Sequence, residues 1–144
     1  MTILFVDDLP DIKVRPAIDY LNAQNIKFDY VICKSIYSAI RYIKEHTSDI
    51  DLAVIDFGLP VDDNSLRFRQ YGGLDIIDYI LDTLELDIPI IINSTSHIEM
   101  LNNEDEEAYF TDYENSLIEH VDNLNGQWLY EFLKEHLKEK LELL

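Results

Sequence analysis

Short apolar runs of strand length alternate with longer stretches of helical period along this 144-residue chain. The runs are almost continuously apolar, which is typical of strands covered by helices on both faces. Alternation of this kind predicts βαβ units and therefore a parallel sheet. The length suits one ordinary domain, and we expect residues 1–144 to form it. The expected strands are Thr2 to Val6, Phe28 to Cys33, Leu52 to Asp56, Pro89 to Asn93 and Ser116 to His120.

The stretches between and after these runs predict five helices. Proline is tolerated in a first helical turn but breaks a helix interior, so it restricts where the first helix can begin. Serine is a favoured N-cap, so Ser35 indicates where the second helix begins. The fourth is the weakest, because its apolar pattern fades into acidic sequence. We expect helices beginning near Lys13 or only at Pro16, after Ser35, after the glycine pair Gly72-Gly73, from about His97, and from about Gly126 to the C-terminus.

The chain is strongly acidic, with a formal net charge of -18 at pH 7. Affinity for nucleic acid comes largely from basic groups that neutralise phosphates, so the charge argues against direct nucleic acid binding by this domain. The second half is the more acidic one: residues 75–144 carry 18 acidic and 3 basic side chains, and an acidic segment spans about 99–115. That segment is either a solvated surface or a docking face for a basic partner. We expect partners to be proteins or cations.

The apolar runs are too short for a membrane. The longest, Ile88 to Ile92, falls far below the roughly 20 residues of a membrane helix. The N-terminal residues lack the basic start and cleavage site of a signal peptide, so we expect a cytoplasmic protein. The single cysteine, Cys33, excludes an intrachain disulfide and suits a small core position.

Acidic side chains stand at the ends of two predicted strands. Asp7 and Asp8 follow the first strand, and Asp56 closes the third. Because a parallel sheet gathers ligand-binding groups at the carboxyl ends of its strands, we expect these acids to meet. Mg²⁺ prefers such oxygen ligands, and one carboxylate could instead attack phosphorus if the cation offsets the charge. The sequence predicts a metal-and-phosphate site, although any one of these acids would also suit a cap or turn.

Four segments together carry a family resemblance. Ile3 to Asp11 contains a strand and an acidic pair, and Val54 to Pro60 places a proline four residues after Asp56. Gly73 to Ile77 opens a helix, and Ile88 to Ser94 is a strand with a terminal hydroxyl. In this order and spacing they resemble the receiver domain of two-component response regulators, over nearly the whole chain. The resemblance implies an α/β fold of flavodoxin-like, receiver type: a doubly wound five-stranded parallel sheet with helices on both faces.

The resemblance also implies roles for individual residues. Asp56 would accept a phosphoryl group from a histidine kinase or phosphotransfer protein, in a reaction that requires Mg²⁺. The metal would be held by Asp7, Asp8, Asp56 and the backbone carbonyl of Gly58. Ser94 would hydrogen-bond the phosphoryl group and couple it to the acidic C-terminal half, where an output protein or effector domain would bind. Such a protein is a regulator rather than an enzyme, and a homodimer is compatible with it.

One basic residue of the family pattern is missing. The family carries a lysine just after its fifth strand, whereas this chain has no Lys or Arg between Arg69 and Lys134. His120 is the nearest substitute, or Val121 stands there if the register differs by one residue. A neutral imidazole would supply a hydrogen bond but no charge near pH 7. The chain therefore resembles an atypical receiver.

A long connection beside the proposed site is a second departure. Residues 61–71 form an extended loop, several residues longer than the family's usual link between third strand and third helix. Arg67 or Arg69 could fold back to replace the lysine, since guanidinium binds phosphate well. Asp62 or Asp63 could instead tighten cation binding. A plain surface excursion is the simpler interpretation.

Two further functions remain open at this point. A pseudo-receiver would keep the fold as a protein interaction module that works without phosphorylation, having lost the lysine. A Mg²⁺-dependent phosphohydrolase with an aspartate nucleophile is weaker, because such enzymes of the haloacid-dehalogenase type place a second aspartate two residues after the first. Here that position is Gly58.

Overall fold

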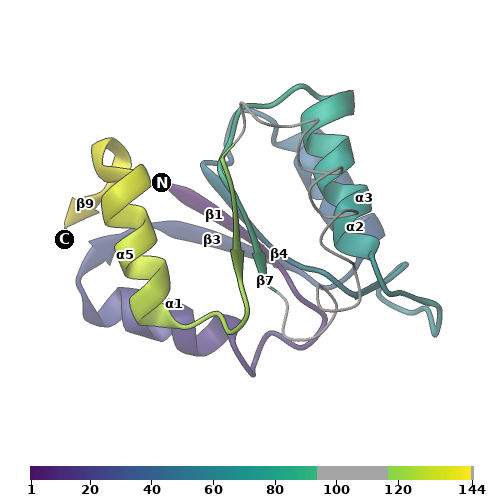
Figure 1. Ribbon diagram of the computed structural model, residues 1–144, viewed down its shortest axis with the longest axis horizontal. Coiled ribbons are helices and arrows are strands. Elements are labelled where there is room, and N and C mark those ends of the chain that lie inside the picture. The colour runs from purple at the N-terminus through teal and green to yellow at the C-terminus, as the bar shows by residue number, and fades with distance from the viewer. Residues whose placement is uncertain (94–116, 144) are drawn as a thin grey trace.

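A five-stranded parallel sheet forms the centre of the computed structural model, which describes residues 1–93 and 117–143 (Figure 1). The strand order is β3-β1-β4-β7-β8, and every neighbouring pair is parallel. Taken in chain order these five strands run second, first, third, fourth, fifth, which is the doubly wound, flavodoxin-like arrangement. The predicted fold class is confirmed. The strands are β1 (Thr2–Val6), β3 (Asp29–Cys33), β4 (Leu52–Asp56), β7 (Ile90–Asn93) and β8 (Ile118–Val121).

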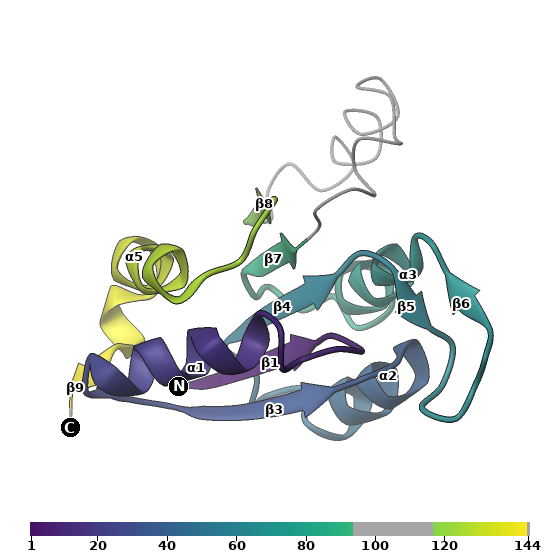
Figure 2. The same cartoon turned by 90° about the horizontal axis from the view of Figure 1, so that it is seen from below.

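Helices cover both faces of the sheet (Figure 2). One face carries α1 (Val14–Ala23) and α5 (Gly126–His136), and the other carries α2 (Ile36–Glu45) and α3 (Gly72–Asp78). The last of these continues as the π-helix η1 (Tyr79–Thr83). The predicted helix starts near Lys13 and after Ser35 are confirmed: Lys13 is the N-cap of α1, and the Ser35 hydroxyl accepts a hydrogen bond from the Ser38 amide at 3.1 Å. The fourth predicted helix, from about His97, lies outside the described residues.

The strands bury alternate side chains on the two faces. In β1, Ile3 and Phe5 pack toward α1 and α5, whereas Leu4 and Val6 pack toward α2 and α3. All four are at most 1% exposed. Such two-sided burial explains the continuous apolar runs of the sequence, since neither face of a central strand meets water.

Most of the segment predicted as an extended loop at 61–71 is the connection of a hairpin. The two short strands of this hairpin, β5 (Leu59–Pro60) and β6 (Phe68–Arg69), pair antiparallel, and residues 61–67 connect them. The hairpin extends beyond α2 and α3 at one end of the molecule (Figure 2). A hydrogen bond of 2.9 Å from the Tyr37 amide to the Val61 carbonyl ties it to the start of α2.

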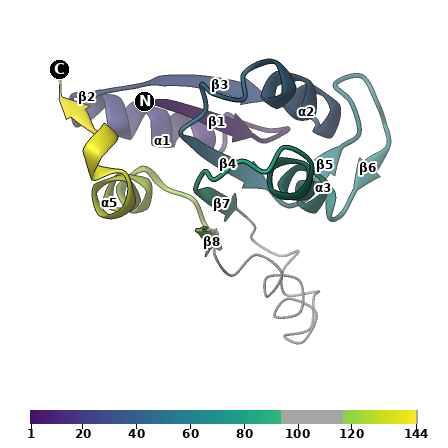
Figure 3. The same ribbon diagram turned by 90° about the horizontal axis from the view of Figure 1, so that it is seen from above.

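The prediction that the last helix runs to the C-terminus is wrong. The helix ends at His136 and is followed by a 3₁₀ turn, η3 (Lys138–Lys140), and by β9 (Glu142–Leu143), which pairs antiparallel with β2 (Ile26–Lys27). Figure 3 shows this strand at the end of the molecule opposite the hairpin. The change of direction keeps Leu137 buried and gives the last backbone groups partners in β2, which a straight helix would not reach.

Asp51 joins the two ends of the chain. Its carboxylate accepts a hydrogen bond from the Thr2 amide at 2.8 Å and another from the Lys140 ammonium at 2.8 Å. Burial alone would raise the pKa of Asp51, but the hydrogen bonds from Lys140 and Thr2 bring it below the ordinary value. A carboxyl with a lowered pKa stabilises the folded state above its unfolded pKa, and that contribution is lost as the pH falls.

We predict that Asp51→Asn lowers the free energy of unfolding by about 1–2 kcal/mol at pH 7, because it weakens two hydrogen bonds to a charged acceptor. The measurement is urea denaturation of this variant and of a control, Asp49→Asn, which removes the same charge from an exposed position. The deficit should shrink as the pH falls below about 4, because the lowered pKa of Asp51 lies below its ordinary value. Equal stability of the two variants at pH 7 would contradict the assignment.

Candidate metal and phosphate site

Three carboxylates meet at the carboxyl edge of the sheet. Asp7 and Asp8 directly follow β1, and Asp56 is the last residue of the neighbouring strand β4. One oxygen from each side chain lies within 4.8 Å of the other two. The sequence prediction that these acids meet is confirmed, and the reason is the one anticipated: adjacent parallel strands end side by side.

Backbone amides hold two of the three carboxylates in place. Asp7 accepts a hydrogen bond from the Leu9 amide at 2.8 Å, and Asp56 accepts one from the Phe57 amide at 2.8 Å. Asp7 is buried, with 6% of its surface exposed, and Asp56 is half-buried. Both contacts are made to neighbours in sequence, so the turns after β1 and β4 themselves orient the acids.

The glycine pair at the start of α3 allows that helix to press on the end of β4. The Gly73 amide donates a hydrogen bond of 2.8 Å to the Phe57 carbonyl. A Cβ atom at this position would stand 2.5 Å from the Asp56 backbone oxygen, closer than real Cβ contacts allow. Only glycine fits without moving the backbone that carries Asp56. Gly58, whose carbonyl we expected to bind metal, lies buried two residues after Asp56.

The three acids line a cavity of about 180 Å³. Two of its polar lining residues, Lys13 and Asn93, were not singled out as site residues from the sequence. Asn93 closes β7 and lies opposite Asp56 in the sheet, and its side-chain oxygen accepts a hydrogen bond from the Leu124 amide at 3.3 Å. A polar residue at the end of an apolar strand is the signal that could have identified it. The described lining is Asp7, Asp8, Leu9, Ile12, Lys13, Asp56 and Asn93.

Crowding of negative charge shapes the acidity of the site. Burial and the neighbouring Asp7 and Asp8 carboxylates raise the pKa of Asp56 to about 7, against opposing effects from the Phe57 amide and the Lys13 ammonium. The pKa of Asp7 is also raised, chiefly by burial. A cation placed among the acids would relieve this repulsion, and oxygen-only donors suit a hard divalent ion. The cluster therefore fits a divalent metal site.

Two other predicted site residues, Ser94 and His120, are not among the described lining residues of this cavity. Ser94 lies outside the described residues. His120 pairs with Ile92 in the sheet, and Val121 stands opposite Asn93, which is the residue level with Asp56. His120 is not among the described lining residues of the cavity, and its proposed role stays a prediction.

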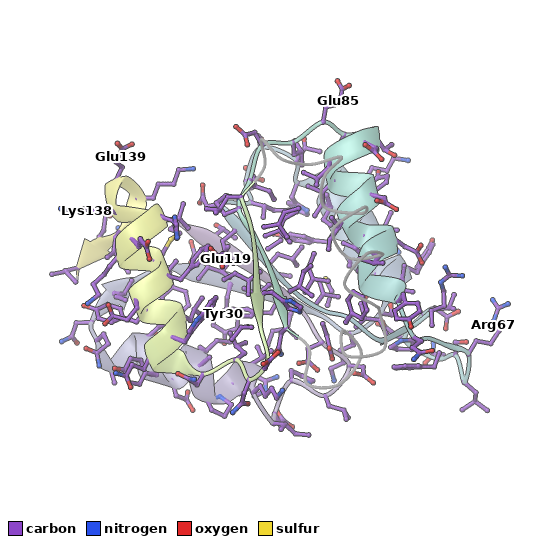
Figure 4. The ribbon with its side chains drawn as sticks, viewed as in Figure 1. Tyr30, Arg67, Glu85, Glu119, Lys138 and Glu139 are labelled. Atoms are coloured by element: carbon purple, nitrogen blue, oxygen red, sulfur yellow. The ribbon has the colours of Figure 1, made fainter. Side chains whose placement is uncertain are left out.

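The hairpin residues considered as substitutes also lie elsewhere. Arg69 forms an ion pair with Asp75 at 2.7 Å, and Arg67 points outward at the far end of the hairpin (Figure 4). Asp62 and Asp63 line a separate cavity of about 810 Å³ between the hairpin and α2. In this conformation the hairpin contributes neither cation nor extra ligand to the acidic cavity.

No protein-family model and no curated protein sequence matches the chain. Solved structures do match. The Mn²⁺-bound form of the response regulator Rcp1 aligns with a TM-score of 0.64 and 20% identity, covering 99% of this chain and 98% of that one. A response regulator receiver domain protein from Clostridium thermocellum gives 0.59 and 18%, covering 96% and 95%. The phosphorylated cyanobacterial phytochrome response regulator RcpA gives 0.61 and 21%, covering 93% and 89%.

These similarities establish that the chain has the receiver fold. At sequence identities of 18–21%, the similarity shows the fold alone, and the chemistry of the site follows from the residues of this chain. Among the described residues, no helix is long and apolar enough to cross a membrane.

We predict that Asp56→Asn stabilises the metal-free protein increasingly as the pH rises from 5.5 to 7.5. The pKa of the native carboxyl is raised to about 7, so the stability that this carboxyl contributes is fully present below its unfolded pKa and is lost as the pH rises through about 7. Since one pKa unit corresponds to about 1.4 kcal/mol, the gain at pH 8 is at most about 4 kcal/mol. Chemical denaturation in EDTA checks this, with the exposed-residue variant Asp19→Asn as the charge-matched control. A gain that is constant across this range, or that decreases with pH, would refute it.

We predict different effects for alanine at the two adjacent glycines. Gly73→Ala should cost about 1–3 kcal/mol and weaken Mn²⁺ binding, because its methyl group meets the Asp56 backbone. Gly72→Ala is the matched control, since its methyl group meets mainly the mobile end of the Ile36 side chain. Isothermal titration with Mn²⁺ and urea denaturation compare the two. Equal losses in both variants would mean that the approach of α3 does not position Asp56.

Proposed function

We propose that the chain is a phosphoacceptor regulatory domain of two-component signal transduction, in which Asp56 accepts a phosphoryl group in a Mg²⁺-dependent reaction. The donor would be a histidine kinase or phosphotransfer protein. The observation that carries the proposal is the trio Asp7, Asp8 and Asp56, with oxygens within 4.8 Å of one another at the carboxyl edge of a receiver-type sheet. The proposed role is regulatory rather than enzymatic. The proposed location is the cytoplasm.

The proposed reaction requires one of the three acids to act as the nucleophile. An oxygen of Asp56 forms the new bond to phosphorus while the bond from phosphorus to the donor nitrogen breaks, and the donor histidine leaves with its electron pair and takes up a proton. A bound divalent cation would offset the charge of the acids and of the incoming phosphoryl oxygens. Asp7 and Asp8, with the Gly58 carbonyl, are the proposed ligands besides Asp56. The backbone hydrogen bonds to Asp7 and Asp56 would hold these two carboxylates in place before the donor arrives.

The structural neighbours are compatible with each half of this proposal. Rcp1 is described in a Mn²⁺-bound form and RcpA in a phosphorylated form, so the same fold holds a divalent ion in one protein and a phosphoryl group in another. The acids of the present chain supply oxygen ligands suited to both Mn²⁺ and Mg²⁺.

The output of phosphorylation would be a changed protein contact. Phosphorylation would shift a two-state equilibrium, with Ser94 as the proposed hydrogen-bond donor to the phosphoryl group. The output protein or effector domain would bind the acidic C-terminal half. In the described part of that half, Glu119, Glu131 and Glu135 border a hollow of about 170 Å³ together with Trp128 and Phe132. Glu131 and Glu135 are exposed and Glu119 is half-buried, and acids beside aromatic rings suit a basic partner segment.

A pseudo-receiver is the second candidate, favoured by one observation. The sequence has no Lys or Arg between Arg69 and Lys134, so the basic residue that the family places after its fifth strand is missing. Under this alternative the fold would serve protein contacts without phosphorylation of Asp56.

We predict that acetyl phosphate with Mg²⁺ adds one acid-labile phosphate per chain. Intact-protein mass spectrometry should show a single added phosphoryl group that is absent in EDTA and absent in Asp56→Asn. Asp11→Asn is the control, because Asp11 is an exposed acid outside the described lining of the cavity. No incorporation into the wild-type protein by acetyl phosphate or by phosphoramidate would favour the pseudo-receiver. Incorporation that survives Asp56→Asn would place the phosphoacceptor elsewhere.

A further inference from the structure

A phosphoryl group on Asp56 would enter an environment that is already crowded with negative charge. Asp7 and Asp8 stand beside it, and their carboxylates raise the pKa of Asp56 before any phosphate is added. A single divalent ion compensates two charges, whereas three acids and a phosphoryl group carry more than that. The site therefore needs a further cationic group for its phosphorylated state.

We propose that Lys13, at the start of α1, is the phosphoryl-binding cation of this site, an inference that rests on the proposed function. Lys13 lines the same cavity as Asp7, Asp8 and Asp56. It is the one basic residue in the described lining, and its side chain is half-buried rather than extended into solvent.

The local structure leaves the Lys13 ammonium available. Lys13 is the N-cap of α1, and its ammonium, which has no acceptor atom, cannot bond the helix amides there. Within the described residues, no ion pair fixes it to a carboxylate. Its charge nonetheless acts on the site, because it lowers the pKa of both Asp7 and Asp56 against the opposing acids. The ammonium is thus close enough to influence both acids without being committed to either.

Other basic side chains near this edge are engaged elsewhere or lie outside the cavity. Arg15 pairs with Asp11 at 2.6 Å, and Arg69 pairs with Asp75 at 2.7 Å. Lys34 directly follows β3 at the same edge of the sheet, but it is exposed and is not in the described lining.

An ammonium on a flexible stem suits the role chemically. It offers three hydrogen-bond donors and can follow the phosphoryl oxygens as the group passes from donor to Asp56. In this role Lys13 forms and breaks no covalent bond. Its contribution is to stabilise the negative charge on the phosphoryl oxygens while the group passes from donor to acceptor.

The test compares Lys13→Met with Lys34→Met, which removes the same charge from an exposed position at the same edge. Methionine keeps an unbranched apolar stem, so the packing of the half-buried side chain is largely retained. Three quantities are measured on the full chain: the initial rate of phosphorylation by acetyl phosphate, the affinity for beryllofluoride in Mg²⁺, and the affinity for Mg²⁺ alone. Lys13→Arg tests whether another cation restores the first two.

We expect Lys13→Met to slow phosphorylation and to weaken beryllofluoride binding by about 10- to 100-fold, the usual effect of losing a charged donor to an anion. Its affinity for Mg²⁺ alone should be unchanged or higher, because a positive charge has left the metal site. Lys34→Met should stay within about twofold of the wild type, and Lys13→Arg should recover much of the loss. A loss of affinity for the anion without a loss of affinity for the metal distinguishes phosphoryl binding from damage to the fold, which would weaken both.

Several outcomes would overturn the inference. Lys13→Met could match Lys34→Met, or lose beryllofluoride and Mg²⁺ affinity together. A larger loss in His120→Gln than in Lys13→Met would assign the role to His120 instead. If the wild type is phosphorylated but Lys13→Met is not impaired, the inference about Lys13 fails while the proposed function stands. If the wild type neither accepts phosphate nor binds beryllofluoride, the proposed function fails as well.

Discussion

Repulsion among three carboxylates at the carboxyl edge of the sheet is the interaction on which the rest of this site depends. The pairing of β1 with β4 forces Asp7, Asp8 and Asp56 together, and burial makes their charges costly. The fold maintains this arrangement through backbone hydrogen bonds to the acids and through the close approach of Gly73 to the Asp56 backbone. A protein that keeps such unfavourable charge in a fixed geometry is prepared for a cation.

That constraint connects the metal, the phosphoryl group and the cationic side chain. A divalent ion would relieve the repulsion among the acids, and a phosphoryl group on Asp56 would restore negative charge at the same place. The protein would thus pass between states that differ mainly in charge at one edge of the sheet. Lys13 is the N-cap of α1, the helix that packs against α5.

The sequence was sufficient where physical signals are local. Continuous apolar runs located the strands, and acids at strand ends predicted their meeting in a parallel sheet. It was insufficient where tertiary contacts decide. Whether His120 or Val121 lies opposite Asn93 depends on the pairing register of β7 and β8, and the apolar pattern of the two strands does not determine this register to within one residue. The C-terminal strand depends on an edge offered by β2, and the hairpin at 59–69 on pairing within a polar stretch. Lys13 was recognised only as a helix start, because nothing local indicates that its side chain lines the acidic cavity.

The most direct test of the central claim is a crystal structure of the full chain with Mn²⁺ and beryllofluoride. We predict anomalous density for one Mn²⁺ ion contacted by Asp56 and by Asp7 or Asp8, together with beryllofluoride bonded to a side-chain oxygen of Asp56. The Lys13 ammonium should lie within hydrogen-bond distance of a fluorine. Mn²⁺ bound away from the three acids, or an unmodified Asp56 beside a filled metal site, would contradict a metal-assisted phosphoacceptor.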